Sequence, residues 1–243
     1  MNKTEETLIT HLIELRKCLI KSVVCILTGF FCCAYFSKDI YHYLSLPLAN
    51  ILPKNSFFIS THPFEAWLTY LKTSLIAGLF ISSPAVFWFI WRFVSPALYK
   101  KEKKYSIAFV GLTSLFFIGG AVFGYFCVFP YAFGYFIGIT EGTDIVFLPQ
   151  MNSYLGFAFR LLLSFGIIFE LPIVMIILSA MGIVTSKQFA LYQKYMIVAA
   201  FVVAAILTPP DVISQILMAV PLIALYEVGL MFAWMVEKKN KPQ

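Results

Sequence analysis

Charged residues are scarce in this sequence. Only 12% of its 243 residues are Asp, Glu, Lys or Arg, whereas 60% are hydrophobic. Soluble domains carry about 25% charged residues, and a chain of this length cannot hide so much apolar surface in a water-facing fold. The composition therefore excludes an ordinary soluble protein and predicts a chain that is solvated by lipid.

The sequence also lacks the parts from which common catalytic sites are built. It contains neither a G-x-x-x-x-G-K-[ST] loop nor an H-E-x-x-H motif. Its three histidines, His11, His42 and His62, lie outside the predicted spans, so a Ser–His dyad within the membrane would have no imidazole. We expect a protein that is not an enzyme and that uses no cofactor.

Cysteines are few, and none lies in a metal-binding pattern. Cys18, Cys25 and Cys32 are spaced by seven residues and share one face of a helix. A metal or redox site is one interpretation of this spacing. Buried free cysteine more often behaves as a small hydrophobe, and no Cys/His cluster has zinc spacing. We expect packing residues and no metal site.

Six apolar segments follow one another along the chain. A membrane-spanning helix needs about 20 mostly apolar residues. The predicted spans are residues 18–36, 67–91, 105–131, 154–181, 195–207 and 212–236. The fifth has only 13 residues, or about 20 Å of helix, so we expect the membrane to thin around it. These spans predict an all-α polytopic membrane protein, with residues 1–243 forming a single domain.

Lys and Arg side chains are concentrated on one side of the predicted spans. Fourteen of them lie in the N-terminal segment, the second and fourth connections and the C-terminal tail, whereas the opposite loops hold only Lys38 and Lys54. Because Lys and Arg are enriched in cytoplasmic loops, both termini are predicted to be cytoplasmic. The net charge of +6 reflects this bias and contact with anionic lipid, not nucleic-acid binding.

Several polar side chains lie in or beside the spans. Glu170, in "FGIIFELP", is costly to place in lipid and is a functional candidate, although a structural role is the alternative. Arg160 is ten residues away, about 15 Å along a helix, so we expect it to extend to the interface instead of pairing with Glu170. Asp211 could cap the last helix, and Gln215 could bond across helices.

The segment before the first span is amphipathic. Its polar face includes Glu14 and Lys17, and an apolar stripe is formed by Leu8, Leu12, Leu15 and Leu19. Such a helix lies at the membrane interface. Basic residues before an apolar run also resemble a cleavable signal peptide, but the apolar runs that follow favour a retained segment.

In combination, the motifs of this chain resemble those of one family. "HLIELRKCL", "HPFEAWLTYLK", "SPALYKKEKK", "FGYFCVFPYAFGYF", "SFGIIFELP" and "LTPPDVISQILMAVPLIALYE" occur in order along nearly the whole chain and resemble TatC, the large subunit of the twin-arginine protein translocase. The resemblance implies a glove-shaped, six-helix protein of the bacterial plasma membrane with both termini inside. It implies a receptor that binds paired-arginine signal peptides and takes part in export of folded proteins, driven by the proton-motive force. It also implies oligomers with TatB-type and TatA-type single-span partners.

The resemblance assigns residues to a cytoplasmic signal-binding surface. Glu14 and Glu102 match the acids implicated in reading the two arginines, and the same surface includes Arg16, Phe93, Pro96 and Leu98. A guanidinium group can bind a carboxylate through two hydrogen bonds, whereas a lysine ammonium is a compact point charge. Two acids at a fixed separation can therefore demand two arginines, and the apolar part of the signal must supply the remaining affinity.

Other positions match the membrane and the outer face. Glu170 matches the intramembrane acid of the family, and Asp211 and Gln215 match a partner-contact region. Outer-face motifs are represented by Pro47, Glu65 and Lys72. The sequence departs from the family at Cys18, where many relatives carry a basic residue, and at Arg160, where an apolar residue is expected.

Two functions of other classes remain open from the residues alone. A proton-coupled transporter of small solutes would also use Glu170. A scaffold for other membrane proteins would bind partners but no signal sequence. Solute flux through the purified chain would favour the first of these, and signal binding would exclude the second.

Overall fold

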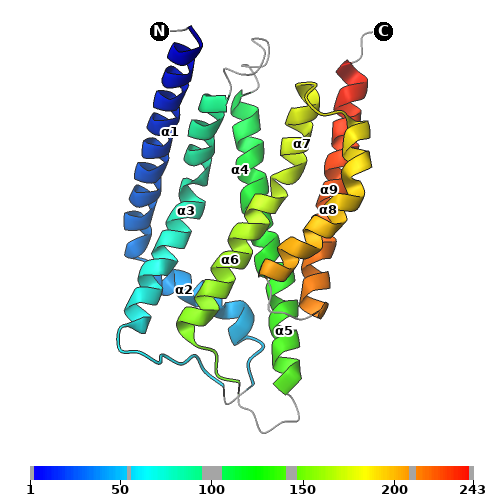
Figure 1. Cartoon of the computed structure of the whole chain (residues 1–243). Helices are drawn as coiled ribbons and strands as arrows, with labels where there is room; N and C mark the ends of the chain where they lie inside the picture. The colour runs from blue at the N-terminus through cyan, green and yellow to red at the C-terminus, as the bar shows by residue number, and fades with distance from the viewer. Residues whose placement is uncertain (1–2, 54–55, 95–105, 141–146, 208–211, 241–243) are drawn as a thin grey trace. The chain divides into compact units, whose positions relative to one another are not determined.

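The computed structural model describes residues 3–53, 56–94, 106–140, 147–207 and 212–240 (Figure 1). Over these ranges the regular secondary structure is helical, and short turns and loops join the helices; one isolated bridge pairs Ile59 with Gln150. A five-residue π-helix, η3 (Gly124–Val128), joins α4 to α5. The helices are α1 (Lys3–Ala34), α2 (Ser37–Ala49), α3 (Glu65–Val94), α4 (Ser106–Phe123), α5 (Phe129–Thr140), α6 (Met151–Phe169), α7 (Leu171–Ala180), α8 (Ser186–Leu207) and α9 (Val212–Asn240).

Six segments of the described chain are long and apolar enough to cross a membrane. They are His11–Ala34, Glu65–Phe93, Phe109–Thr140, Met151–Ala180, Ser186–Leu207 and Gln215–Lys238. A helix satisfies its own backbone hydrogen bonds, which is what a segment in lipid requires. The predicted all-α polytopic class is confirmed, whereas the glove shape, the single domain and the side on which the termini lie stay predictions.

The fifth of these helices is longer than predicted. Helix α8 has 22 residues, or about 33 Å, because it also includes a polar segment, residues 186–194, that hydropathy alone excludes. A capping box starts it: the Thr185 amide donates to Gln188 Oε1 at 2.8 Å, and the Gln188 amide donates to Thr185 Oγ1 at 3.3 Å. The expectation of a 13-residue helix is therefore wrong, whereas thinning of the membrane around it stays a prediction.

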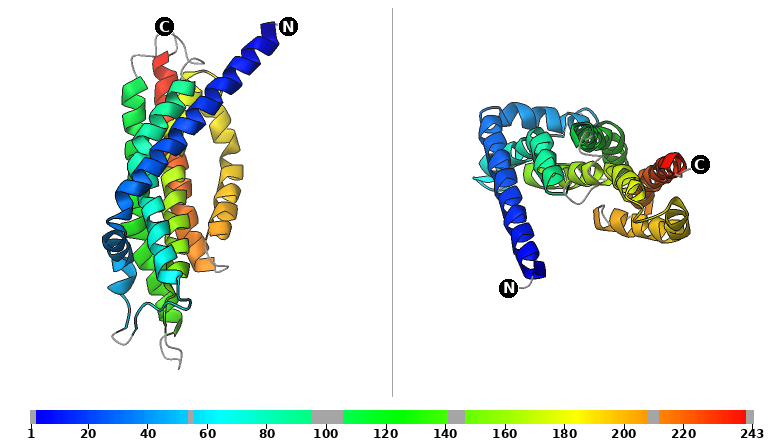
Figure 2. Two further views of the ribbon diagram at one scale, coloured as in Figure 1. Left: turned by 90° about the vertical axis from the view of Figure 1, so that its left-hand side faces the viewer. Right: turned by 90° about the horizontal axis from the view of Figure 1, so that it is seen from above.

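Contacts between residues divide the chain into two compact units, of which the first comprises Met1–Ser45 and Ser60–Leu115. In this unit α1 packs along α3 (Figure 2). The helices approach each other closely at two glycines. A Cβ atom added to Gly78 would lie 2.4 Å from the Phe30 amide nitrogen, and one added to Gly29 would lie 2.7 Å from the Gly78 carbonyl oxygen. Small residues permit such close backbone approach in membranes.

The second unit comprises Leu46–Ile59 and Phe116–Gln243. Helices α7 and α8 both pack against α9. Aromatic side chains fill much of the interior: the ring centroid of Phe133 lies 5.3 Å from that of Tyr154 and 5.4 Å from that of Phe157. The start of α6 is tied to an earlier segment, since the Ile59 amide donates to the Pro149 carbonyl at 3.0 Å and the Met151 amide donates to the Ile59 carbonyl at 3.1 Å.

Gly78→Ala is expected to destabilise the first unit. The added methyl group would meet backbone atoms, which cannot move aside as a side chain can, and overpacking costs about 1–3 kcal/mol. Thermal unfolding in detergent should show a lower Tm. The control is Gly111→Ala in the same unit, where an added Cβ meets nothing within 4 Å. Equal Tm values for the two variants would contradict a close α1–α3 contact at Gly78.

Candidate functional site

The predicted signal-binding residues begin on the exposed face of α1. Glu14 and Arg16 are both exposed. The carboxylate of Glu14 lies near the imidazole of His11, with 4.0 Å between Glu14 Oε2 and His11 Nδ1, and more than half of each side chain is exposed. The side chains of His11 and Glu14 are therefore accessible to a ligand that arrives from solution or from the membrane interface.

Phe93 lies near the end of α3 and contacts the same histidine. Its ring is stacked on that of His11, with a centroid distance of 4.5 Å and an interplanar angle of 28°. The tertiary structure thus brings Phe93 beside the turn of α1 that carries Glu14. His11 was given no role from the sequence, although its position three residues before Glu14 places both on the polar face of one helix.

The rest of the predicted surface lies beyond the described chain. Pro96, Leu98 and Glu102 fall in residues 95–105, which the structure does not describe. The described part of the surface therefore includes the Glu14 carboxylate, the Arg16 guanidinium group and the Phe93 ring, and the imidazole of His11 contacts both Glu14 and Phe93. A carboxylate beside an aromatic ring suits a ligand that carries both a cation and apolar groups, because a guanidinium group can bind the first and pack on the second.

Glu170 occupies the break between α6 and α7. Its backbone is the C-cap of α6 and the N-cap of α7, and Pro172 follows in the first turn of α7. Pro172 has no N–H to donate, so the helix is interrupted at this point. The Glu170 Oε1 atom is buried and has no hydrogen-bond partner in the described chain. An intramembrane carboxyl group of this kind is available to a ligand or a neighbouring helix.

The polar residues near the start of α9 differ from Glu170. The Gln215 side chain donates from Nε2 to the Phe201 carbonyl at 3.0 Å, so it makes the bond across helices that was considered for it. Asp211 lies outside the described residues. Arg160 is exposed on α6. A role for Asp211 or Gln215 in contact with partners stays a prediction.

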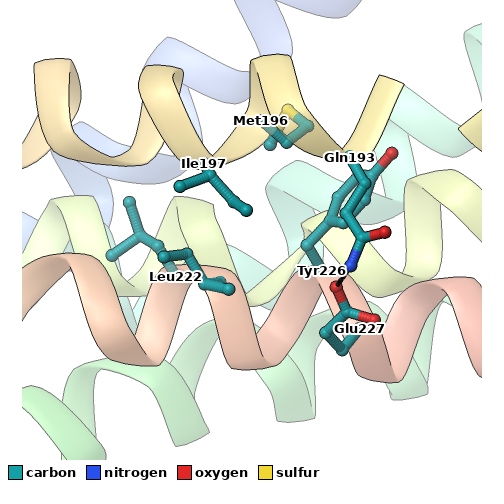
Figure 3. A pocket seen from close by; sticks show the side chains of 7 residues that line it. Gln193, Met196, Ile197, Leu222, Tyr226 and Glu227 are labelled. Atoms are coloured by element: carbon teal, nitrogen blue, oxygen red, sulfur yellow. Dashed lines mark hydrogen bonds between the residues drawn. The ribbon is translucent and has the colours of Figure 1, made fainter. Parts of the chain in front are cut away.

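A second polar cluster between α8 and α9 was not identified from the sequence. Figure 3 shows Gln193 of α8 donating from Nε2 to Glu227 Oε1 of α9, beside a small pocket. The Tyr226 hydroxyl donates to the Phe189 carbonyl at 2.7 Å. The pocket is lined by Gln193, Met196, Ile197, Leu222, Ile223, Tyr226 and Glu227. Glu227 is thus bonded within the chain. In the sequence, Gln193 and Glu227 appear only as polar residues in two separate apolar segments. The sequence does not give the register between the two helices, so it could not show that these side chains meet.

Of the predicted outer-face residues, Glu65 accepts hydrogen bonds within the chain. Glu65 begins α3 and is buried; its Oε2 accepts hydrogen bonds from the Thr61 amide at 2.6 Å, the Thr61 hydroxyl at 3.0 Å and the His62 amide at 3.3 Å. Burial raises the pKa of the Tyr41 hydroxyl, and the nearby Tyr70 and Glu65 raise this pKa further. Lys72 is exposed on α3, and Pro47 is half-buried in α2. Glu65 therefore stabilises the start of α3 directly.

Metal-binding residues do not gather in the part of the chain that the structure describes. Those residues include no group of three or more His, Cys, Asp or Glu side chains that could hold a metal ion. Cys18, Cys25 and Cys32 are free thiols, of which Cys18 is buried and Cys32 is exposed. The functional candidates are therefore the surface at His11, Glu14 and Phe93, and the intramembrane carboxyl group of Glu170.

Comparison with known proteins connects these features to one family. Residues 10–221 match the family model described as Sec-independent protein translocase protein (TatC). The protein of this name from Desulforapulum autotrophicum is 42% identical over 95% of this chain and 85% of its own length. The corresponding protein of Escherichia coli K12 is 40% identical over 94% of this chain and 88% of its own length.

A solved structure agrees with this match. The crystal structure of a twin-arginine translocase receptor, TatC, superposes with a TM-score of 0.82 at 37% identity, covering 93% of this chain and 99% of that chain. The sequence match and the structural match both extend over most of the chain. Together with the six membrane-spanning segments, they show that this multi-pass membrane protein belongs to the TatC family of Sec-independent protein translocase components.

Proposed function

We propose that this chain is the signal-peptide receptor of a twin-arginine translocase in a bacterial plasma membrane, with both termini in the cytoplasm. One observation carries the proposal: His11 joins Glu14 of α1 to Phe93 of α3. An acid of α1 and an aromatic ring near the end of α3 are thereby held together, and the charge bias predicts that this part of the chain lies on the cytoplasmic side. A paired-arginine signal first arrives on that side.

Each residue of the surface has a distinct part in this proposal. Glu14 binds one arginine of the signal, and Glu102, from the connection after α3, binds the other. Phe93, Pro96 and Leu98 contact the apolar groups that follow the arginines. Arg16 orients neighbouring carboxylates on the surface. Because an exposed ion pair contributes only about 0–1 kcal/mol, the apolar contacts must supply most of the affinity.

Glu170 serves a later step in the same proposal. Its buried Oε1 has no bond within the described chain, so a polar group of an inserted signal or of a TatB-type helix can bind it. Asp211 and Gln215 contact TatA-type or TatB-type single-span partners, with which the chain forms oligomers. Pro47, Glu65 and Lys72 shape the outer face. The proton-motive force drives export of the folded cargo.

Glu14→Gln should weaken binding of a paired-arginine signal peptide about fivefold, because the amide keeps the size of the side chain but loses about 1 kcal/mol of charged interaction. Fluorescence anisotropy with the purified chain measures this directly. Lys17→Gln, on the same exposed face, is the matched control and should bind as the unmodified chain does. Undiminished binding by Glu14→Gln would contradict the proposed contact, and absence of signal binding by the unmodified chain would favour a solute transporter or a scaffold.

Glu170→Ala should abolish or strongly reduce crosslinks to a TatB-type partner and export of a folded paired-arginine reporter in cells that lack their own TatC. Because no described bond is lost, its Tm should change little. Glu227→Ala is the contrasting variant: it leaves the amide of Gln193 without its carboxylate, so it should lower the Tm. Unchanged crosslinks and export for Glu170→Ala would show that this acid has a structural role.

A further inference from the structure

His11 contacts both of the described groups to which the proposal assigns signal binding. Its Nδ1 lies 4.0 Å from Glu14 Oε2, and its ring is stacked on that of Phe93. The imidazole of His11 therefore lies next to the carboxylate of Glu14 on α1 and the ring of Phe93 on α3. Replacing or protonating this imidazole changes its contacts with both side chains.

We propose that His11 is a positioning residue of this surface and makes its affinity for signal peptides depend on pH. The inference rests on the proposed function and concerns the regulation of the same site. When His11 is neutral, it holds the ring of Phe93 and does not compete for the carboxylate of Glu14. When it is protonated, it is a cation beside the carboxylate that an arginine must reach.

The stacked contact positions Phe93 before a ligand arrives. Phe93 lies at the end of a helix, where a side chain with no neighbour would sample several rotamers. Offset stacking between rings about 4.5–7 Å apart is favourable, and a side chain already held in one rotamer loses less entropy when a ligand binds. His11 thus raises the affinity for an apolar group on Phe93 without touching that group itself.

The charge of His11 acts on the other half of the surface. Imidazole changes its charge between about pH 5 and 8, whereas the side-chain carboxylate, lysine ammonium and guanidinium groups ordinarily keep theirs between about pH 6 and 8. Among the described side chains, the charged groups along the two helices near His11 are Glu14, Arg16 and Lys17 on α1 and Arg92 on α3, all of them exposed. Protonation of His11 adds a cation here, which pairs with Glu14 and repels an incoming arginine.

Signal binding to the full-length chain should therefore weaken as the pH falls. The probe is a fluorescent paired-arginine signal peptide without His, Asp or Glu, measured by anisotropy with protein in lipid nanodiscs. Its affinity should fall about three- to fivefold between about pH 8 and pH 6, as expected for one competing exposed ion pair. His11→Phe keeps the ring contact but takes no proton, so its affinity should be the same at both pH values.

Further variants separate the two effects. His11→Ala removes the ring as well, so its affinity should be about two- to tenfold lower at the higher pH and should not depend on pH. His11→Gln provides a second uncharged side chain, which should also remove the pH dependence. The control is His42→Phe, because His42 lies on α2, away from this surface in sequence, and is one of only two other histidines in the chain. His42→Phe should keep the pH dependence of the unmodified chain.

Two results would overturn the inference while leaving the proposed function intact. One is an affinity of the unmodified chain that does not change with pH, and the other is a pH dependence that persists in His11→Phe and His11→Gln. In both cases Glu14→Gln and Phe93→Ala would still weaken binding. If those two variants bind as the unmodified chain does, the signal-binding surface itself is wrong, and the role of His11 is excluded with it.

Discussion

The hydrocarbon interior of a membrane provides no water to bond with polar groups, and the rest of this structure depends on that constraint. Helices satisfy their own backbone hydrogen bonds, which accounts for the six apolar helical segments in the described part of the chain. The same constraint applies to side chains. Gln193 bonds Glu227, and Gln215 bonds a backbone carbonyl of α8, so these polar groups are satisfied by a neighbouring helix. The α8–α9 pair is therefore held by hydrogen bonds as well as by apolar contact.

Glu170 differs from these polar residues because its carboxyl oxygen Oε1 has no hydrogen-bond partner in the described chain. Its backbone lies at the break between α6 and α7, and its Oε1 atom is buried without a hydrogen-bond partner in the described chain. Glu227, also in a membrane span, has a partner. The two acids thus have the same chemistry and different environments. An acid that is hydrogen-bonded within the chain, such as Glu227, contributes to stability. An acid without such a bond, such as Glu170, is available for a ligand, and this availability agrees with membership of a translocase family.

Close helix packing supplies the other condition for the surface formed by His11, Glu14 and Phe93. In the first unit, Gly29 and Gly78 let the backbones of α1 and α3 approach closely. Because the two helices are packed together, the ring of Phe93 reaches His11, and His11 in turn lies near Glu14. The glycine contact between Gly29 and Gly78 and the surface formed by His11, Glu14 and Phe93 are therefore parts of the same helix pair.

The sequence by itself determined the class of the fold and the family, and it supplied the candidate residues of the site. Hydropathy over about 20 residues is a local property, so the six spans could be predicted, and the motifs around Glu14 and Glu170 indicated the family. Hydropathy misplaced the start of α8, because a polar capping box at Thr185 and Gln188 can begin a helix that apolar content does not reveal. The tertiary structure alone decided which polar groups meet. The stacking of His11 on Phe93 and the bond from Gln193 to Glu227 join residues far apart in sequence, and such contacts depend on helix register and packing, which no local pattern of residues encodes.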